Sequence, residues 1–152
     1  LDCRKIRPGV LLGLALGGIF GFVSSTLSLL RQSGLVQATP LFGSNLFWYH
    51  FLLAILTGFW ESLFFFGFVG TVIFDKYRAR PLFLQLLAVV GIFVFFHLPN
   101  TLLVFPNSAV PGQVVTLALF ALGQALIFYR WRNLYTLTLS HAIWGLSLLF
   151  FG

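Results

Sequence analysis

The sequence predicts an all-α fold, a polytopic membrane bundle of about five transmembrane helices. Of its 152 residues, 59% are hydrophobic and 8% are charged, whereas about 25% of an ordinary soluble domain is charged. Nine Lys and Arg and three Asp and Glu cannot cover the surface of a soluble protein of this size. The composition therefore excludes a soluble globular domain, a disordered chain and a nucleic-acid-binding module. It makes the lipid bilayer the expected environment.

Five stretches have, or nearly have, the roughly 20 mostly apolar residues that a spanning helix needs. They are Gly9–Leu30, Phe47–Phe74, Pro81–Phe105, Gln113–Tyr129 and Leu134–Phe151. The first is too long for a cleaved signal peptide and lacks a small-residue cleavage site; the second is long enough to tilt, and the fourth is slightly short. The segment 31–46 contains Gly, Pro and Asn and is expected to be irregular or to lie on the membrane surface. We expect residues 1–152 to form one transmembrane domain.

The basic residues set the expected orientation of these helices. Eight of the nine Lys and Arg residues lie in the segments 4–7, 76–80 and 130–132, and the alternate side carries only Arg31. This alternation predicts a cytoplasmic N-terminus and a C-terminus on the opposite side.

The chain has one Cys, Cys3, and no Met. A single Cys excludes a disulfide framework and a Cys-based metal site, so Cys3 is expected to be a bystander thiol. Because residue 1 is not Met, we expect the numbered chain to be processed, truncated or incompletely known at its N-terminus.

A stripe of small residues runs along the first predicted span. It consists of Gly9, Gly13, Gly17, Gly21 and then Ser25. Small residues four apart let another helix approach closely. Two uses are open: packing against a helix of the same chain, and docking of another subunit.

Three ionisable side chains lie deep in the predicted spans: Glu61, His97 and His141. At bilayer depth such a side chain costs about 2.5–3.5 kcal/mol on insertion scales, so a function is expected where they are kept. Ala54, Thr57 and Gly58 share the helix face of Glu61, which suggests that the carboxylate points into the bundle. His141 is expected to lie shallower than the other two. For each residue the structural alternative is a protonated Glu or a neutral His hydrogen-bonded inside the bundle.

These residue types suit hydrolysis. A carboxylate and an imidazole on adjacent helices can hold and deprotonate a water molecule, and a second imidazole can stabilise an oxyanion or ligate a metal. One Glu and two His also resemble the ligand set of hydrolytic zinc sites, although the H-E-x-x-H spacing does not occur. Transporters use Glu and His as proton relays, but five spans without a duplicated half do not resemble the usual inverted repeats.

Three short motifs, in this order, carry a family resemblance. They are ESLFFFG at Glu61–Gly67, FVFFH at Phe93–His97 and HAIWG at His141–Gly145. They are similar to the motifs E-E-x-x-x-R, F-x-x-x-H and H-x-x-x-N of the CAAX protease and bacteriocin-processing (CPBP) family of intramembrane metalloproteases, also called the Abi family. Their order and intervals fit that family, and the resemblance covers residues 55–150.

The resemblance implies functions for the three polar residues. Glu61 and His97 would activate water, and His141 would stabilise the tetrahedral intermediate. Whether a divalent metal such as zinc, held by these same residues, takes part is open.

The chain departs from the family pattern at three positions. Ser62 stands at the second Glu of the first motif, Phe66 at its Arg, and Gly145 at the Asn of the third motif. Gly145 offers no side-chain donor, and the loss of one oxyanion donor lowers a rate about 10²–10³-fold.

Two functions from different classes follow. The three departures, the short chain, the glycine stripe and 20 Phe residues favour a non-catalytic relative, a subunit or assembly or scaffold factor whose partners are other membrane-protein subunits. The three polar residues favour an intramembrane endopeptidase that cleaves a peptide or membrane-protein segment near the cytoplasmic face. In either case the family implies a bacterial inner membrane or an organellar membrane such as the thylakoid.

Overall fold

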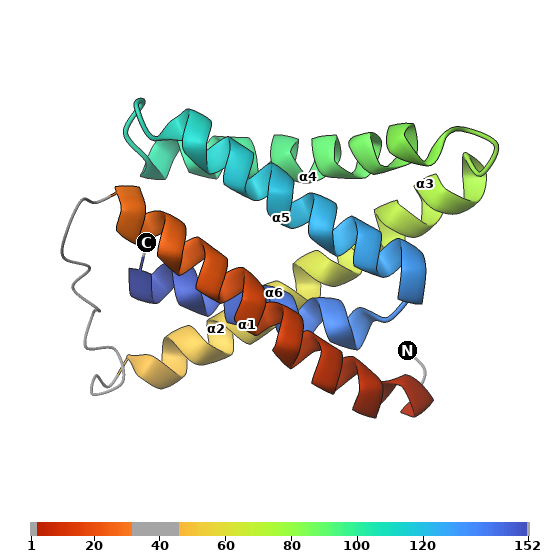
Figure 1. Cartoon of the computed structure of the whole chain (residues 1–152), viewed down its shortest axis with the longest axis horizontal. Helices are drawn as coiled ribbons and strands as arrows, with labels where there is room; N and C mark the ends of the chain where they lie inside the picture. Colours follow the sequence, from red (N-terminus) through yellow and green to blue (C-terminus); the bar gives the residue numbers. More distant parts are fainter. Residues whose placement is uncertain (1–2, 32–45, 152) are drawn as a thin grey trace. The chain divides into compact units, whose positions relative to one another are not determined.

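The computed structural model describes residues 3–31 and 46–151, and most of this backbone is helical. Most of the predicted surface segment 31–46 and the side chains of Cys3 and Ser25 lie outside the described residues. In chain order the elements are η1 (Cys3–Lys5), α1 (Ile6–Arg31), α2 (Phe47–Glu61), η3 (Ser62–Gly70), α3 (Thr71–Lys76), α4 (Leu82–Val104), α5 (Val110–Trp131) and α6 (Leu134–Phe151), as Figure 1 shows. The predicted all-α class is confirmed.

Within the described residues, four helical segments are long and apolar enough to cross a membrane. They are Ile6–Val23 in α1, Phe47–Lys76 through α2, η3 and α3, and the whole of α4 and α5. In each segment at most 33% of an apolar window of 18 residues is buried within the chain, and apolar side chains such as Phe22, Trp48 and Leu103 are 73%, 72% and 87% exposed. A surface of this kind fits a lipid environment. The chain is therefore a polytopic membrane protein, as predicted.

The fifth predicted span is α6, whose bounds are those predicted from the sequence. No side chain beyond Ser147 belongs to the described part of this helix. The fourth predicted span differs at its start: α5 begins at Val110 and has 22 residues, so it is not short. Pro111 is tolerated there because the backbone N–H groups of the first helical turn make no intrahelical hydrogen bond, so that the missing N–H of Pro costs none.

The second predicted span changes its winding halfway. α2 ends at Glu61, and the next nine residues, Ser62–Gly70, wind as a π-helix before α3 begins. π-helical winding is rare in proteins, and where it occurs it is often at a functional site. Here it begins at the residue after the only carboxylate found within the predicted spans.

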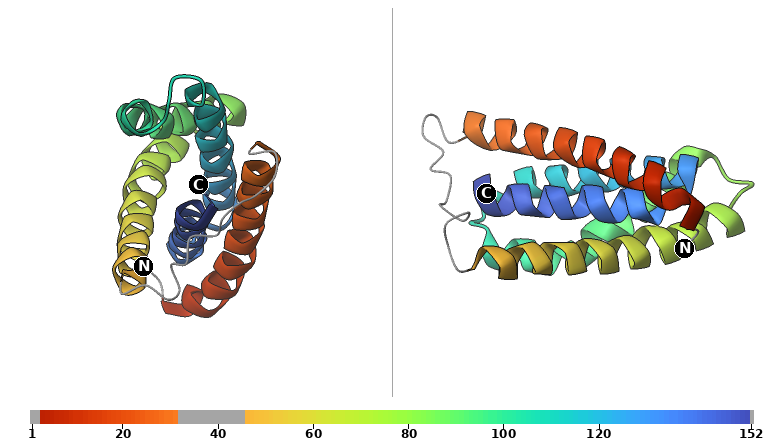
Figure 2. Two further views of the ribbon diagram at one scale, coloured as in Figure 1. Left: turned by 90° about the vertical axis from the view of Figure 1, so that its left-hand side faces the viewer. Right: turned by 90° about the horizontal axis from the view of Figure 1, so that it is seen from below.

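The chain divides into two compact units. One comprises Leu1–Ser62 and Asn133–Gly152, and the other comprises Leu63–Arg132. In the first unit α6 lies between α1 and α2, as both views in Figure 2 show. In the second unit α4 packs against α5. Whether the two units make up the single domain expected from the sequence stays a prediction.

The small-residue stripe of α1 faces α6 within the first unit. Its members there are Gly9, Gly13, Gly17 and Gly21. A Cβ atom at Gly13 would lie 3.0 Å from the carbonyl oxygen of Thr136, and one at Gly17 would lie 2.7 Å from Cδ1 of Ile143. Because these distances are shorter than ordinary contacts, the glycines let α1 lie close against α6. The sequence left two uses of the stripe open, and the structure shows the first of them, packing against a helix of the same chain.

Candidate active site

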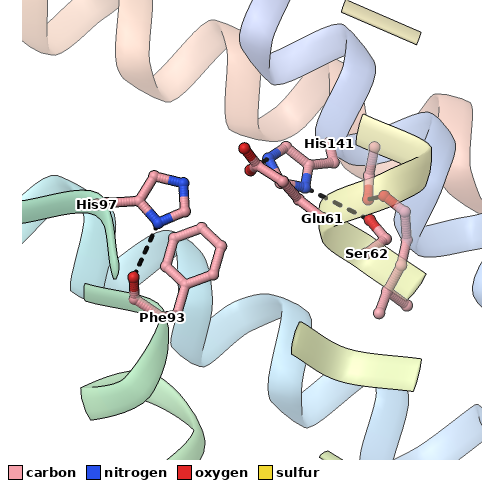
Figure 3. A network of polar contacts seen from close by, with 7 residues as sticks. Glu61, Ser62, Phe93, His97 and His141 are labelled. Atoms are coloured by element: carbon pink, nitrogen blue, oxygen red, sulfur yellow. Dashed lines mark hydrogen bonds and ion pairs between the residues drawn. The ribbon is translucent and has the colours of Figure 1, made fainter. Parts of the chain in front are cut away.

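The first unit brings Glu61 and His141 together. Oε2 of Glu61, at the end of α2, lies 3.2 Å from Nε2 of His141 in α6 (Figure 3). The side chain of His141 is 6% exposed and that of Glu61 is 25% exposed. The sequence suggested that His141 lies shallower than Glu61, but their side chains meet at the same level.

A glycine allows this meeting. Gly58 is buried one turn before Glu61, and a Cβ atom there would lie 2.9 Å from the backbone nitrogen of Ala142 and 3.0 Å from the carbonyl oxygen of Thr138. Both neighbours are backbone atoms of α6 on either side of His141. Because Gly58 has no side chain, α2 and α6 approach backbone to backbone at this point. The close approach presents Glu61 to His141.

The start of α6 is tied to the start of α1. The side-chain oxygen of Asn133 accepts a hydrogen bond from the backbone N–H of Tyr135 (3.0 Å), as in a helix N-cap, and its side-chain nitrogen donates to the carbonyl oxygen of Lys5 (3.1 Å). The hydroxyl of Thr136 donates to the carbonyl oxygen of Gly9 (3.2 Å). These bonds fix the position of α6 in the direction of the α1 helix axis. The signal that sequence reasoning missed is an Asn directly before an apolar helix.

Ser62 lies at the other nitrogen of the same imidazole. Its Oγ is 3.4 Å from Nδ1 of His141, and Ser62 has no exposed surface. Figure 3 shows the Glu61 carboxylate and the Ser62 hydroxyl at the two ring nitrogens. The sequence marked Ser62 only as a departure from the family motif. In the structure this departure keeps a polar group against His141.

His97 belongs to the second unit, in α4. Its Nδ1 lies 2.8 Å from the carbonyl oxygen of Phe93. Because a carbonyl oxygen only accepts hydrogen bonds, Nδ1 carries the hydrogen, and in the neutral ring the lone pair is on Nε2. The ring also stacks on Phe93, with 4.1 Å between centroids. A fixed ring with a basic Nε2 is what a general base or a metal ligand needs.

Phe66 stands where the family has an Arg, and it is fully buried in the second unit. Its ring stacks on Phe93 with 5.7 Å between centroids, and the ring of Phe65 meets the same Phe93 at 5.1 Å. The Arg position has therefore become part of the apolar packing around the residue that holds His97.

Gly145, where the family has an Asn, lies one turn after His141 in α6. A Cβ atom at Gly145 would meet no other atom within 4 Å among the described residues. The position therefore lacks a donor but has room for a side chain.

The donor set fits a metal ion only in part. Carboxylate and imidazole are both ligands of zinc, and catalytic zinc sites use three protein ligands. Within the described residues of either unit, no group of three or more His, Cys, Asp and Glu side chains is placed to hold a metal ion. We therefore derive no step through a metal.

The apolar helices define the chain as an integral membrane protein, and a carboxylate–imidazole pair, with the imidazole buried and the carboxylate partly exposed, lies between α2 and α6. The family model of the type II CAAX prenyl endopeptidase Rce1-like proteins matches residues 43–147. This match covers more than half of the chain and includes all three motifs, and the chain belongs to this family. The resemblance found in the sequence is thereby confirmed. No curated protein and no solved structure matches the chain.

Proposed function

We propose that the chain is an intramembrane endopeptidase that hydrolyses a peptide or membrane-protein segment with an activated water molecule. The observation that carries the proposal is the 3.2 Å contact between Glu61 and His141. The Glu61 carboxylate keeps a quarter of its surface exposed, so that it can accept a hydrogen bond from water as well. His141 is almost fully covered, which suits a donor that acts in a site of low dielectric.

In the proposed reaction Glu61 acts first as a base and then as an acid, and His141 acts as a hydrogen-bond donor. The Glu61 carboxylate takes a proton from water, and the water oxygen attacks the carbonyl carbon of the scissile peptide bond. Nε2–H of His141 donates to the oxyanion that forms. When the C–N bond breaks, the proton held by Glu61 passes to the leaving amine, so the products are a carboxylic acid and an amine, and Glu61 is again a carboxylate. His97 shares in water activation by analogy with the family motif, and its basic Nε2 supports this assignment.

Replacing Glu61 by Gln tests the proposal, because Gln has the same size but is no base. The probe is a quenched-fluorescent peptide with a farnesylated CAAX end, together with the same peptide without the farnesyl group, in liposomes that hold the purified protein. We expect Glu61→Gln to lower turnover about 10²–10⁴-fold, the usual contribution of a general base. The matched control is Asp75→Asn, since Asp75 is a solvent-exposed carboxylate paired with Arg132 at 2.8 Å. Undiminished turnover in Glu61→Gln, or a wild type no faster than this variant on both peptides, contradicts the proposal.

A non-catalytic relative is the second candidate, and the observation that favours it is Gly145. With Gly at the family's Asn position, one donor of the expected oxyanion site is missing. The glycine stripe no longer supports this candidate, because it packs on α6. A scaffold predicts a stoichiometric membrane-protein partner after purification in mild detergent. A stable lone monomer counts against it.

A further inference from the structure

Resting on the proposed function, we propose that Ser62 is a positioning residue for His141. Its hydroxyl donates a hydrogen bond to Nδ1 of the imidazole, and this bond keeps the single hydrogen of the neutral ring on Nε2, facing Glu61.

The contacts of the ring carry this inference. Nε2 lies 3.2 Å from a Glu61 carboxylate oxygen, and Nδ1 lies 3.4 Å from Oγ of Ser62. An ionised carboxylate only accepts hydrogen bonds, so Nε2 supplies the hydrogen. A neutral imidazole has one N–H, and its other nitrogen is an acceptor. The donor for Nδ1 is then the Ser62 hydroxyl, in a place where Ser62 is fully buried.

The backbone holds Ser62 where this bond needs it. The N–H of Ser62 is bonded to the carbonyl oxygens of both Gly58 and Phe59, which joins Ser62 to the last turn of α2. Gly58 is also the residue at which α2 touches the α6 backbone. Two consecutive residues, Glu61 and Ser62, therefore contact the two nitrogens of the His141 ring on the neighbouring helix.

The tautomer decides what His141 can do in the reaction. With the hydrogen on Nε2, the ring donates on the side of Glu61, where the water is activated and the oxyanion forms. With the hydrogen on Nδ1, a lone pair would face the developing negative charge instead. Ser62 therefore supports the chemical step and not substrate binding, and it does so at the position where the family motif has a second Glu.

The test is the tautomer itself, read from ¹⁵N NMR of histidine-labelled protein in detergent micelles. The chain has three His, and the His141 signals are identified by their loss in His141→Asn. We expect the wild type and Ser62→Thr to carry the hydrogen on Nε2 of His141, and Ser62→Ala to give a mixture of tautomers. The matched control is Ser147→Ala, since the Ser147 hydroxyl donates to the carbonyl oxygen of Trp144 in the same helix; it should leave the His141 signals unchanged.

Turnover gives the second readout. Ser62→Ala should lower kcat about 10–100-fold, which is the range for loss of the hydrogen-bond partner that orients a metal-bound imidazole, with KM unchanged, and Ser62→Thr should restore most of it. A wild-type ring that carries its hydrogen on Nδ1, or a Ser62→Ala spectrum like that of the wild type, overturns the inference. If Ser62→Ala does not fold, the wild-type and Ser62→Thr spectra decide it. A failed Glu61→Gln test would overturn the peptidase proposal alone, because the tautomer is measured without substrate.

Discussion

Replacing Gly58 by Ala tests whether the close approach of α2 and α6 builds the site. The added Cβ atom would lie 2.9 Å and 3.0 Å from two backbone atoms of α6, about 0.5 Å short of an ordinary contact of about 3.5 Å. Backbone atoms cannot turn away as a side chain can, so the two helices have to separate. A separation of about 0.5 Å lengthens the 3.2 Å contact between Glu61 and His141 to about 3.7 Å, which is beyond hydrogen-bond range.

The expected loss of stability and turnover in Gly58→Ala can be estimated, and Gly91→Ala is its matched control. Overpacking costs about 1–3 kcal/mol, while Ala is better than Gly in a helix by about 1 kcal/mol. Gly91→Ala in α4 makes the same chemical change where a Cβ atom meets nothing within 4 Å among the described residues. This variant therefore has the gain in helix propensity without the cost of overpacking. Gly58→Ala should therefore be about 1–3 kcal/mol less stable than Gly91→Ala. Since a 1 Å misplacement can lower a rate about 10²-fold, we expect Gly58→Ala to lose about 10-fold in turnover.

The assay is unfolding by SDS in mixed micelles, together with peptide turnover in liposomes for the same three proteins. The unfolding free energies of Gly58→Ala and Gly91→Ala are compared with each other and not only with the wild type. Both variants share the gain in helix propensity of Ala over Gly, so their difference reports the overpacking alone. If Gly58→Ala is as stable as Gly91→Ala and turns over peptide like the wild type, the argument that Gly58 sets the distance between Glu61 and His141 is refuted.

Three further predictions follow. Gly145→Asn should raise turnover by up to about 10²–10³-fold, the contribution of one oxyanion donor, because the position has open space; an unchanged rate in a folded variant would show that no donor acts from there. If His97 acts on the same water as Glu61, as the family motif implies, His97→Ala combined with Glu61→Gln should lose no more turnover than the worse single variant, since the effects of such residues are non-additive; multiplied losses would separate their functions. Cys3, the one Cys of the chain, should react with a membrane-impermeant maleimide from the cytoplasmic side in oriented vesicles, whereas labelling from the other side would reverse the predicted topology.

Much of the helical framework could be predicted from the sequence, because hydropathy and length decide it. α4 spans Leu82–Val104, within one residue at each end of the predicted stretch, and α6 has the predicted bounds. The sequence could not show the π-helical winding at Ser62–Gly70. Apart from Ser62 this stretch consists of apolar residues and Gly, and its composition does not distinguish one helical winding from another.

The sequence predicts candidate residues for a site but not their contacts. Glu61 and His141 stand out in it because ionisable groups are costly in a bilayer, and the structure places these two together, whereas that they form a catalytic site stays a prediction. The contact of Ser62 depends on where α2 ends and on the position of α6 along α1, which no local pattern encodes. Arg132 is another such residue. The sequence marked it only as a topology signal, whereas it pairs with Asp75 at 2.8 Å and takes a left-handed backbone conformation, with φ of 47°.

The three departures from the family motif differ in what they remove. At position 62 a carboxylate is replaced by a hydroxyl that still contacts His141. At position 66 a guanidinium is replaced by a ring that packs on Phe93, and losing the charge pair of these two positions can be neutral for folding. Only at Gly145 is a group lost with no replacement among the described residues, because a Cβ atom there would meet none of them within 4 Å. The departures therefore remove one oxyanion donor and not three, and this is why we propose a slow peptidase in preference to a scaffold.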